Sequence, residues 1–166
     1  SLEEMVGKVR AAVDTRRQDL VVIARTDACA VEGFEAAIER AGRYIEAGAD
    51  VTFVEAPESL EDLKALPHRL KAPQLVNMVL GGKTPIIEAK AAAEMGFGLV
   101  LYANAALQGA VHGMQAALST LKEKGVLDES AVTSFAERQR LVDKPAFDRM
   151  EARYAPQVVS ENPTRG

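Results

Sequence analysis

Four short apolar runs constrain the fold of this 166-residue chain more than any other feature. They are rich in β-branched residues and span Leu20–Ala24, Val51–Val54, Gln74–Val76 and Leu99–Tyr102. Each is followed by a segment with helical periodicity, and they start about 23 to 31 residues apart, the length of one βα unit. Continuous apolar runs without alternation are typical of parallel strands that helices cover. The sequence therefore predicts an α/β fold with a parallel sheet.

Capping patterns predict where the helices begin and end. The segment Ser1–Glu4 has the pattern of a capping box, so the sequence predicts a helix from its first residues. Thr84–Pro85 is typical of a helix N-terminus, with the proline in the first turn. Three glycines stand where a left-handed residue is expected to end a helix: Gly48, Gly96 and Gly125.

The pattern divides the chain into three parts. Residues 1–125 contain a leading helix and four βα units, which is half of what a closed (β/α)8 barrel of eight strands and about 250 residues requires. Residues 126–155 carry no strand signal and predict helices, one starting at Asp128 and one with Pro145 in its first turn. Residues 156–166 are rich in Pro, Ser, Asn and Gly, and we expect a mobile tail.

Composition and charge exclude several classes of partner. The 20 basic and 24 acidic residues give a net charge of −4, and no basic block follows a pattern suited to nucleic acid. The single cysteine excludes an internal disulfide, and the two histidines are too isolated for a metal cluster. There is no apolar signal core, and the longest uncharged run, Gly96–Val111, is too short and polar for a membrane span. We expect a cytoplasmic protein that binds neither nucleic acid nor membrane.

Polar side chains follow the predicted strands, where parallel α/β folds collect their ligands. The strands end in Arg25 and Asp27, in Glu55, in Asn77 and in Asn104. Because side chains alternate along a strand, Arg25 and Asp27 share one face. The rigid fork of a guanidinium suits an anionic substrate. The alternative is a salt bridge from Arg25 to Asp27 or Glu55 that only closes the top of the sheet.

The other strand-end residues leave alternatives open. Glu55 can be a base, a metal-associated group or the partner of Arg25, since a carboxylate at the end of an apolar strand needs a partner. Asn77 can orient a carboxylate or make a turn. Cys29 can be a nucleophile, although a small buried hydrophobe is its commoner role. The pair Gly81–Gly82 is not part of a nucleotide-binding P-loop, because Asn77 stands where that motif requires glycine; it lets the backbone turn beside a ligand.

Four linked motifs resemble a known superfamily. They read "ARTDA", "EAGADVTFVEAP", "VNMVLGGKTP" and "MGFGLVLYANAAL", and the match runs from about Leu2 to Tyr154. In this order and spacing they resemble the carboxyl half of the isocitrate lyase and phosphoenolpyruvate mutase superfamily. That superfamily includes methylisocitrate lyase, dimethylmalate lyase, an oxaloacetate decarboxylase and the phosphonomutases. The resemblance implies the C-terminal half of a (β/α)8 TIM barrel with extra C-terminal helices.

The resemblance also implies a reaction. It is magnesium-dependent cleavage of a carbon–carbon bond in a small 2-hydroxy or 2-oxo (di)carboxylate, through an enolpyruvate-like oxyanion that the metal and nearby cations stabilise. One alternative is a phosphonomutase of the carboxyphosphonoenolpyruvate or phosphoenolpyruvate type, acting on a P–C bond. An alternative of another class is a non-catalytic half-barrel that binds a ligand or a protein.

Particular residues take roles from the resemblance. Arg25 and Glu55 are the implied catalytic residues, with Glu55 near the metal, which it can contact through water. The implied substrate-binding residues are Arg25, Asp27, Asn77, Met78, Val79 and Arg138. Gln108 stands where methylisocitrate lyase has an arginine, which disfavours methylisocitrate as the substrate. The resemblance implies that the Mg²⁺ ligands and the catalytic cysteine loop belong to the amino half of the superfamily, which either precedes this sequence or is a separate piece.

The resemblance implies an assembly as well. The post-barrel helices of the superfamily pack on a neighbouring subunit, and residues 129–154 correspond to that part. Apolar side chains on these otherwise charged helices suit such an interface: Phe135, Leu141, Phe147 and Met150. We expect a homo-oligomer, a tetramer with exchanged terminal helices, whose ligand is a small anionic carboxylate.

Overall fold

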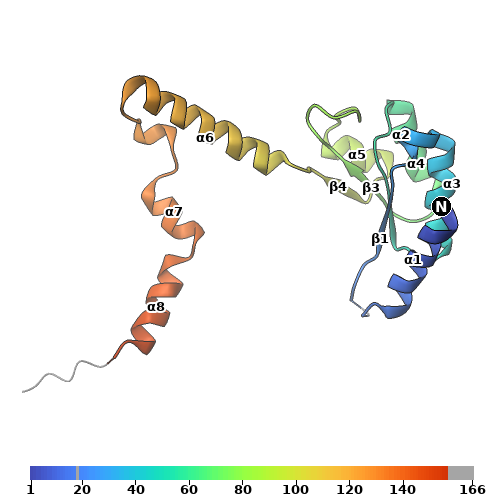
Figure 1. Ribbon diagram of the computed structural model, residues 1–166, viewed down its shortest axis with the longest axis horizontal. Helices are drawn as coiled ribbons and strands as arrows, with labels where there is room; N and C mark the ends of the chain where they lie inside the picture. The colour runs from blue at the N-terminus through green and yellow to red at the C-terminus, as the bar shows by residue number, and fades with distance from the viewer. Residues whose placement is uncertain (18, 157–166) are drawn as a thin grey trace, which may run out of the picture. The chain divides into compact units, whose positions relative to one another are not determined.

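The computed structural model describes residues 1–17 and 19–156 and contains a four-stranded parallel sheet (Figure 1). Its strands are β1 (Ile23–Thr26), β2 (Val51–Val54), β3 (Gln74–Asn77) and β4 (Leu99–Leu101). They lie in sequence order, and each pair of neighbours is parallel. A barrel keeps this order, whereas a doubly wound sheet reverses it at a switch point. The predicted α/β fold is confirmed, and the strand order is that of half a (β/α)8 barrel.

Five helices accompany the sheet. They are α1 (Leu2–Thr15), α2 (Ala28–Glu32), α3 (Phe34–Glu46), α4 (Leu60–Arg69) and α5 (Ala89–Met95). The main core joins α2, α3, α4 and α5 to β2 and β3, and a second cluster joins α1 and α3 to β1. Buried leucines of α4 and small residues of α3 make the helix–sheet contact close.

The two faces of the sheet differ, and the face without helices carries the predicted site. In β1, Ala24 and Thr26 are buried, while Ile23 and Arg25 are exposed. A small separate cluster lies on the same face as Arg25 and consists of Val51, Phe53 and Leu75. Leu99 of β4, which pairs with Leu75 of β3, is also exposed. In a closed barrel this face lines the interior.

Most predicted helix ends are confirmed. The Glu4 backbone N–H donates to Ser1 Oγ at 3.2 Å, which caps α1. Gly96 ends α5 in the left-handed conformation, with φ of 100°. Gly48 and Gly125 also have positive φ and follow α3 and α6 (Ala105–Lys124).

Two sequence predictions of element boundaries were wrong. β1 runs from Ile23 to Thr26 because pairing with β2 starts at Ile23, and the residues Leu20 and Val21 lie exposed ahead of it. Thr84–Pro85 does not begin a helix, since α5 begins at Ala89. The backbone N–H of Ile87 instead donates to Met78 Sδ at 3.5 Å, which holds the preceding segment against the core.

A second unit starts at Ala110, within α6, while the first comprises residues 1–109. After α6 it contains the 3₁₀ helix η1 (Glu129–Ala131), α7 (Phe135–Leu141) and α8 (Lys144–Tyr154). Asp128 caps the 3₁₀ helix, and Pro145 lies in the first turn of α8 as predicted. Apart from residue 156, the predicted tail lies outside the described residues.

No residue of α6, η1, α7 or α8 is buried in the described part of the chain. These helices expose large apolar side chains, so their own contacts do not supply a core. Within residues 1–17 and 19–156, no helix is both long and apolar enough to cross a membrane.

Asp50 connects the start of the sheet to α1, and this predicts a pH-dependent stability. Its carboxylate accepts from the Val22 N–H at 2.8 Å and pairs with Arg16. These contacts, led by the Val22 hydrogen bond, lower the pKa of Asp50 below its usual 3.8. A carboxyl with a lowered folded-state pKa stabilises the fold above its unfolded pKa and loses that contribution as pH falls through the folded one.

We therefore expect Asp50→Asn to be less stable than the wild type near neutral pH, with the difference disappearing in acid below the usual pKa of 3.8. Urea denaturation across a pH series measures this. Glu46→Gln is a matched control, because Glu46 pairs with Arg43 on the exposed surface of α3. A stability difference that stays constant into acid would contradict the assignment.

Candidate functional site

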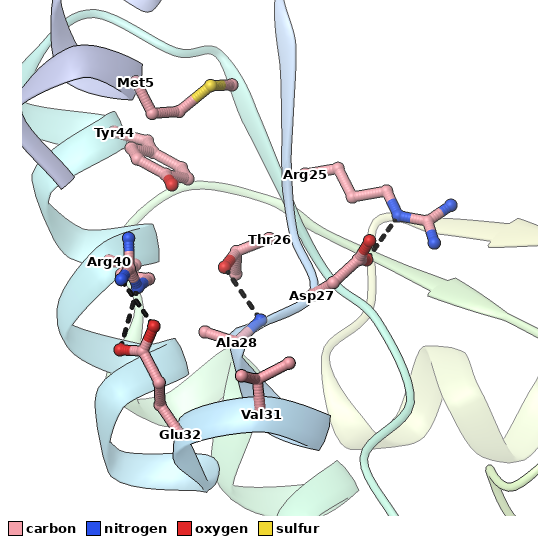
Figure 2. Close-up of a pocket in the computed structure, with 9 residues that line it drawn as sticks. All are labelled: Met5, Arg25, Thr26, Asp27, Ala28, Val31, Glu32, Arg40 and Tyr44. Atoms are coloured by element: carbon pink, nitrogen blue, oxygen red, sulfur yellow. Dashed lines mark hydrogen bonds and ion pairs between the residues drawn. The ribbon is translucent and has the colours of Figure 1, made fainter. Parts of the chain in front are cut away.

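Arg25 lies between two carboxylates at the carboxyl ends of β1 and β2. Its Nε donates to Asp27 Oδ1 at 2.7 Å, and its Nη2 lies 3.1 Å from Glu55 Oε2. The β1–β2 register pairs Arg25 with Phe53, and the guanidinium carbon stands 5.1 Å from the centre of that ring. Arg25, Asp27 and Glu55 therefore lie together, as the sequence predicted. Figure 2 shows the Arg25–Asp27 contact.

The charge of this group follows from its contacts. The hydrogen bond that Arg25 donates to Asp27, followed by the charge of Glu55, raises the already high pKa of Arg25. With both carboxylates ionised, the three side chains carry a net charge of −1. The salt bridge that the sequence left as an alternative is present, although half of the Arg25 side chain (51%) remains exposed. An anionic ligand would need either a further cation or displacement of one carboxylate.

A hollow of about 250 Å³ adjoins this group between the ends of β2 and β3. Its lining residues are Glu55, Ala56, Asn77, Val79, Gly82, Lys83 and Thr84. Within residues 1–17 and 19–156, neither Glu55 Oε2 nor Asn77 Oδ1, both buried, has a hydrogen-bond partner. The ionic contact of Arg25 with Glu55 Oε2 is off the hydrogen-bond direction and leaves that acceptor unsatisfied. Buried acceptors without donors are rare, and these two favour a ligand that brings a donor or a cation.

The backbone around the hollow is constrained at two points. Ala56, directly after Glu55, has φ of 55°, a conformation that costs a side-chain-bearing residue about 1–2 kcal/mol. Such strain is commonest at functional sites. On the β3 side, the N–H of Gly82 donates to Val79 O at 2.9 Å. A Cβ at Gly82 would stand 3.0 Å from that same oxygen, so a larger residue would crowd the turn.

Not every predicted residue lies in this hollow. Val79 lines it, but Met78 is 2% exposed, packs in the main core, and donates its backbone N–H to Leu101 O at 2.7 Å. A substrate contact by the Met78 side chain is therefore not available in this structure. Arg138 belongs to α7 in the second unit, where it stacks on Phe135 at 4.9 Å from the ring centre. Its substrate contact stays a prediction.

Sequence reasoning missed Lys83 and treated Thr84 as a helix cap, yet both line the hollow. The glycine pair before them was the available signal, since it predicted a turn beside a ligand. Cys29 packs partly against the main core, and burial raises the pKa of its thiol. A raised pKa disfavours the reactive thiolate.

A second hollow, of about 290 Å³, lies beside the end of β1 and α2 (Figure 2). It is lined by Met5, Arg25, Thr26, Asp27, Ala28, Val31, Glu32, Arg40 and Tyr44. Arg40 and Glu32 hold each other at 2.6 Å, and Thr26 Oγ1 accepts from the Ala28 N–H at 3.2 Å. Because these polar groups already have partners, this hollow carries less evidence of a ligand than the one beside Glu55 and Asn77.

The oxygen atoms at the strand ends suit part of a magnesium site. Mg²⁺ prefers oxygen donors and is usually held by one or two carboxylates with waters and substrate oxygens. Among the described residues, Glu55 Oε2 and Asn77 Oδ1 are buried oxygens of this kind without a hydrogen-bond donor, although Glu55 Oε2 also has its ionic contact with Arg25. Within residues 1–17 and 19–156, no group of three or more His, Cys, Asp or Glu residues could hold a metal ion. These residues therefore fit contacts around a cation rather than its full ligand set.

Comparison with known proteins gives the relationship of the chain. The family model described as phosphoenolpyruvate phosphomutase matches residues 1–122. A 2-methylisocitrate lyase of Aeropyrum pernix is 45% identical over 125 residues, covering 75% of this chain and 40% of that protein. A 2,3-dimethylmalate lyase of Eubacterium barkeri is 37% identical over 160 residues, covering 93% and 55%. The chain thus spans about half the length of the curated relatives it matches.

Solved structures give the same picture. A 2,3-dimethylmalate lyase, described as a PEP mutase/isocitrate lyase superfamily member, superposes with a TM-score of 0.80 at 35% identity over 92% of this chain and 56% of that one. Oxaloacetate acetylhydrolase with oxalate has a TM-score of 0.80 at 34% identity, over 92% and 54%. Phosphonopyruvate hydrolase with oxalate and Mg²⁺ has a TM-score of 0.78 at 30% identity, over 94% of this chain and 57% of that one. The chain belongs to the phosphoenolpyruvate phosphomutase family, within the isocitrate lyase and phosphoenolpyruvate mutase superfamily.

Proposed function

We propose that this protein is a magnesium-dependent carbon–carbon lyase that acts on a small 2-hydroxy or 2-oxo dicarboxylate. The observation that carries the proposal is a pair of buried oxygens, Glu55 Oε2 and Asn77 Oδ1, which have no hydrogen-bond donor within residues 1–17 and 19–156, with Glu55 in ionic contact with the guanidinium of Arg25. A substrate with a hydroxyl beside a carboxylate supplies both the donor that these oxygens lack and the anion that an arginine binds. The similarity to 2-methylisocitrate and 2,3-dimethylmalate lyases supports the same reaction class.

The residues of this chain have separable parts in that reaction. Arg25 binds a substrate carboxylate, and Asn77 accepts from the substrate and orients it. Glu55 Oε2 takes the proton of the 2-hydroxyl, directly or through a water. The electron pair of that O–H bond forms the new C=O bond as the C–C bond breaks. The electrons of the broken C–C bond pass to the other fragment as an enolpyruvate-like oxyanion, and a proton returned from Glu55 or water then adds to its carbon. Phe53 and Asp27 hold Arg25 in place for this step.

A divalent cation meets the charge requirement of the site. Arg25, Asp27 and Glu55 together carry −1, so an anionic substrate needs additional positive charge to bind among them. Mg²⁺, when bound, supplies this charge and lowers the energy of negative charge that develops on substrate oxygen. We expect its direct ligands outside this sequence, with Glu55 contacting it through water. The solved relative with oxalate and Mg²⁺ supports this requirement.

Phosphonomutase chemistry is the second candidate. The matching family model carries that name, and the phosphonopyruvate hydrolase structure is similar to this chain. Breaking a P–C bond produces the same kind of oxyanion, so Arg25 and Asn77 would serve either reaction. Gln108 favours a dicarboxylate over the tricarboxylate methylisocitrate, because a glutamine supplies no charge for a third carboxylate.

Assays of the full-length protein with Mg²⁺ test the proposal. The panel consists of malate, 2,3-dimethylmalate, methylisocitrate, citrate and phosphonopyruvate. We expect a keto-acid product from a dicarboxylate and loss of turnover when EDTA removes the metal. Conversion of phosphonopyruvate alone, into phosphoenolpyruvate, would favour the second candidate. No turnover of any compound would contradict both and support a non-catalytic half-barrel that binds a ligand or a protein.

We also propose a homo-oligomer, a tetramer with exchanged terminal helices. What supports it is the exposure of large apolar side chains on α7 and α8, namely Phe135, Leu141, Phe147 and Met150. Such side chains on helices without a core of their own favour burial against another subunit.

A further inference from the structure

We infer that Lys83 is a specificity-determining residue that binds a second negatively charged group of the substrate, and that Glu58 holds it when no substrate is bound. This inference rests on the proposed function and names a contact within the same site. It begins from the lining of the hollow beside Glu55, in which Lys83 is the cation. Neither Lys83 nor its ion-pair partner Glu58 has a part in the proposed lyase step.

A closed turn holds the backbone of the Lys83 loop, whereas the Lys83 side chain is largely exposed and paired with Glu58. The turn from Val79 to Gly82 is closed by a 2.9 Å hydrogen bond, and Gly81 has φ of 79°. Beyond this turn, the Lys83 side chain is 63% exposed and its ammonium lies 3.1 Å from Glu58 Oε1. Glu58 belongs to the segment between β2 and α4, so the ion pair joins the loops that follow β2 and β3.

An exposed ion pair of this kind gives way at little cost. Surface pairs contribute about 0–1 kcal/mol to stability, and Glu58 is itself 60% exposed. A substrate anion in the partly enclosed hollow is a stronger partner for the ammonium, because fewer waters screen it there. The flexible four-carbon stem of lysine lets the charge move from Glu58 to the ligand without moving the backbone.

The position of Lys83 determines which substrates it distinguishes. Arg25 contacts Glu55 from β1, whereas Lys83 lines the hollow, which Glu55 also lines, from the loop after β3. Two cations on separate elements therefore flank the reacting region. A substrate with one carboxylate engages Arg25 alone, and a substrate with two engages Arg25 and Lys83. The site thus favours doubly charged acids over singly charged ones of the same chemistry.

Calorimetric binding of lactate and malate to the full-length protein with Mg²⁺ tests this. Both are 2-hydroxy acids, and malate has the second carboxylate. We expect Lys83→Met to weaken malate binding by about tenfold or more while changing lactate binding by less than about twofold. Glu58→Gln removes the competing partner and should strengthen malate binding, by up to about fivefold. Lys90→Met is the matched control, because Lys90 pairs with Glu94 on the exposed surface of α5 and does not line the hollow.

The outcomes separate this inference from the function it rests on. If Lys83→Met weakened the binding of lactate and malate equally, or weakened neither, the role of Lys83 would be overturned. The proposed function would still stand, because it is tested by turnover of the wild type. Failure of the wild type both to bind and to cleave any acid of the assay panel would overturn the proposed function, and the inference with it.

Discussion

Replacing Arg25 with methionine is expected to lower kcat/KM for the preferred dicarboxylate by about a hundredfold or more. The guanidinium contacts Asp27 at 2.7 Å and Glu55 at 3.1 Å and stacks on Phe53. Its removal takes away the substrate's anion contact and leaves two neighbouring carboxylates without their shared cation. Since both carboxylates then repel an anionic substrate, KM should rise along with the loss in kcat. Steady-state kinetics of the full-length protein measures both.

Two variants show whether the geometry of Arg25 matters beyond its charge. Arg25→Lys keeps the positive charge but has no planar fork to reach Asp27 and Glu55 together, so an intermediate loss is expected. Arg43→Met is the matched control: Arg43 is similarly exposed, at 50%, and pairs with Glu46 on α3. If Arg25→Met kept the activity of Arg43→Met, Arg25 would only close the top of the sheet.

Leu63→Ala is expected to lower the free energy of unfolding by about 2–5 kcal/mol. Leu63 lies on α4, is 0% exposed and belongs to the main core with Leu66, Val54 and Val76. Removing its side chain loses buried apolar surface and leaves a cavity at the contact between α4 and the sheet. Urea denaturation followed by circular dichroism measures the change.

A control on the same helix separates packing from helix propensity. Leu60→Ala makes the same chemical change at the first residue of α4, where the side chain is 49% exposed. Its cost should stay within about 0.5 kcal/mol. Comparable losses in the two variants would show that α4 does not pack on the sheet as described.

Local patterns predicted the architecture because strand and helix periods depend on nearby residues. The continuous run Val51–Val54 became β2 with all four residues buried, and Gly96 ended α5 in the left-handed conformation. Strand alternation placed Arg25 and Asp27 on one face. The same alternation, applied to β3, would have turned Met78 away from Asn77 and into the core, where it lies.

Non-local contacts account for what the sequence did not predict. The run Leu20–Ala24 carries no information on where β2 pairs with it, so the start of β1 at Ile23 depended on register. Lys83 follows a glycine pair, but its pairing with Glu58, 25 residues away, results from two loops meeting at one end of the sheet. Thr84 has the sequence pattern of a helix cap, but the segment after it is held by the contact of Ile87 with Met78, and α5 begins at Ala89.

The amino-acid sequence by itself determined the parallel βα architecture, the chemical character of the strand ends and the family motifs, because each depends on residue type and short spacing. Only the tertiary structure decided that Arg25 is shared by two carboxylates, and that Glu55 Oε2 and Asn77 Oδ1 are buried with no hydrogen-bond partner in the described part of the chain. Those properties arise where separate strands end side by side, and the distances between atoms there follow from packing and register, which no short segment of the chain encodes.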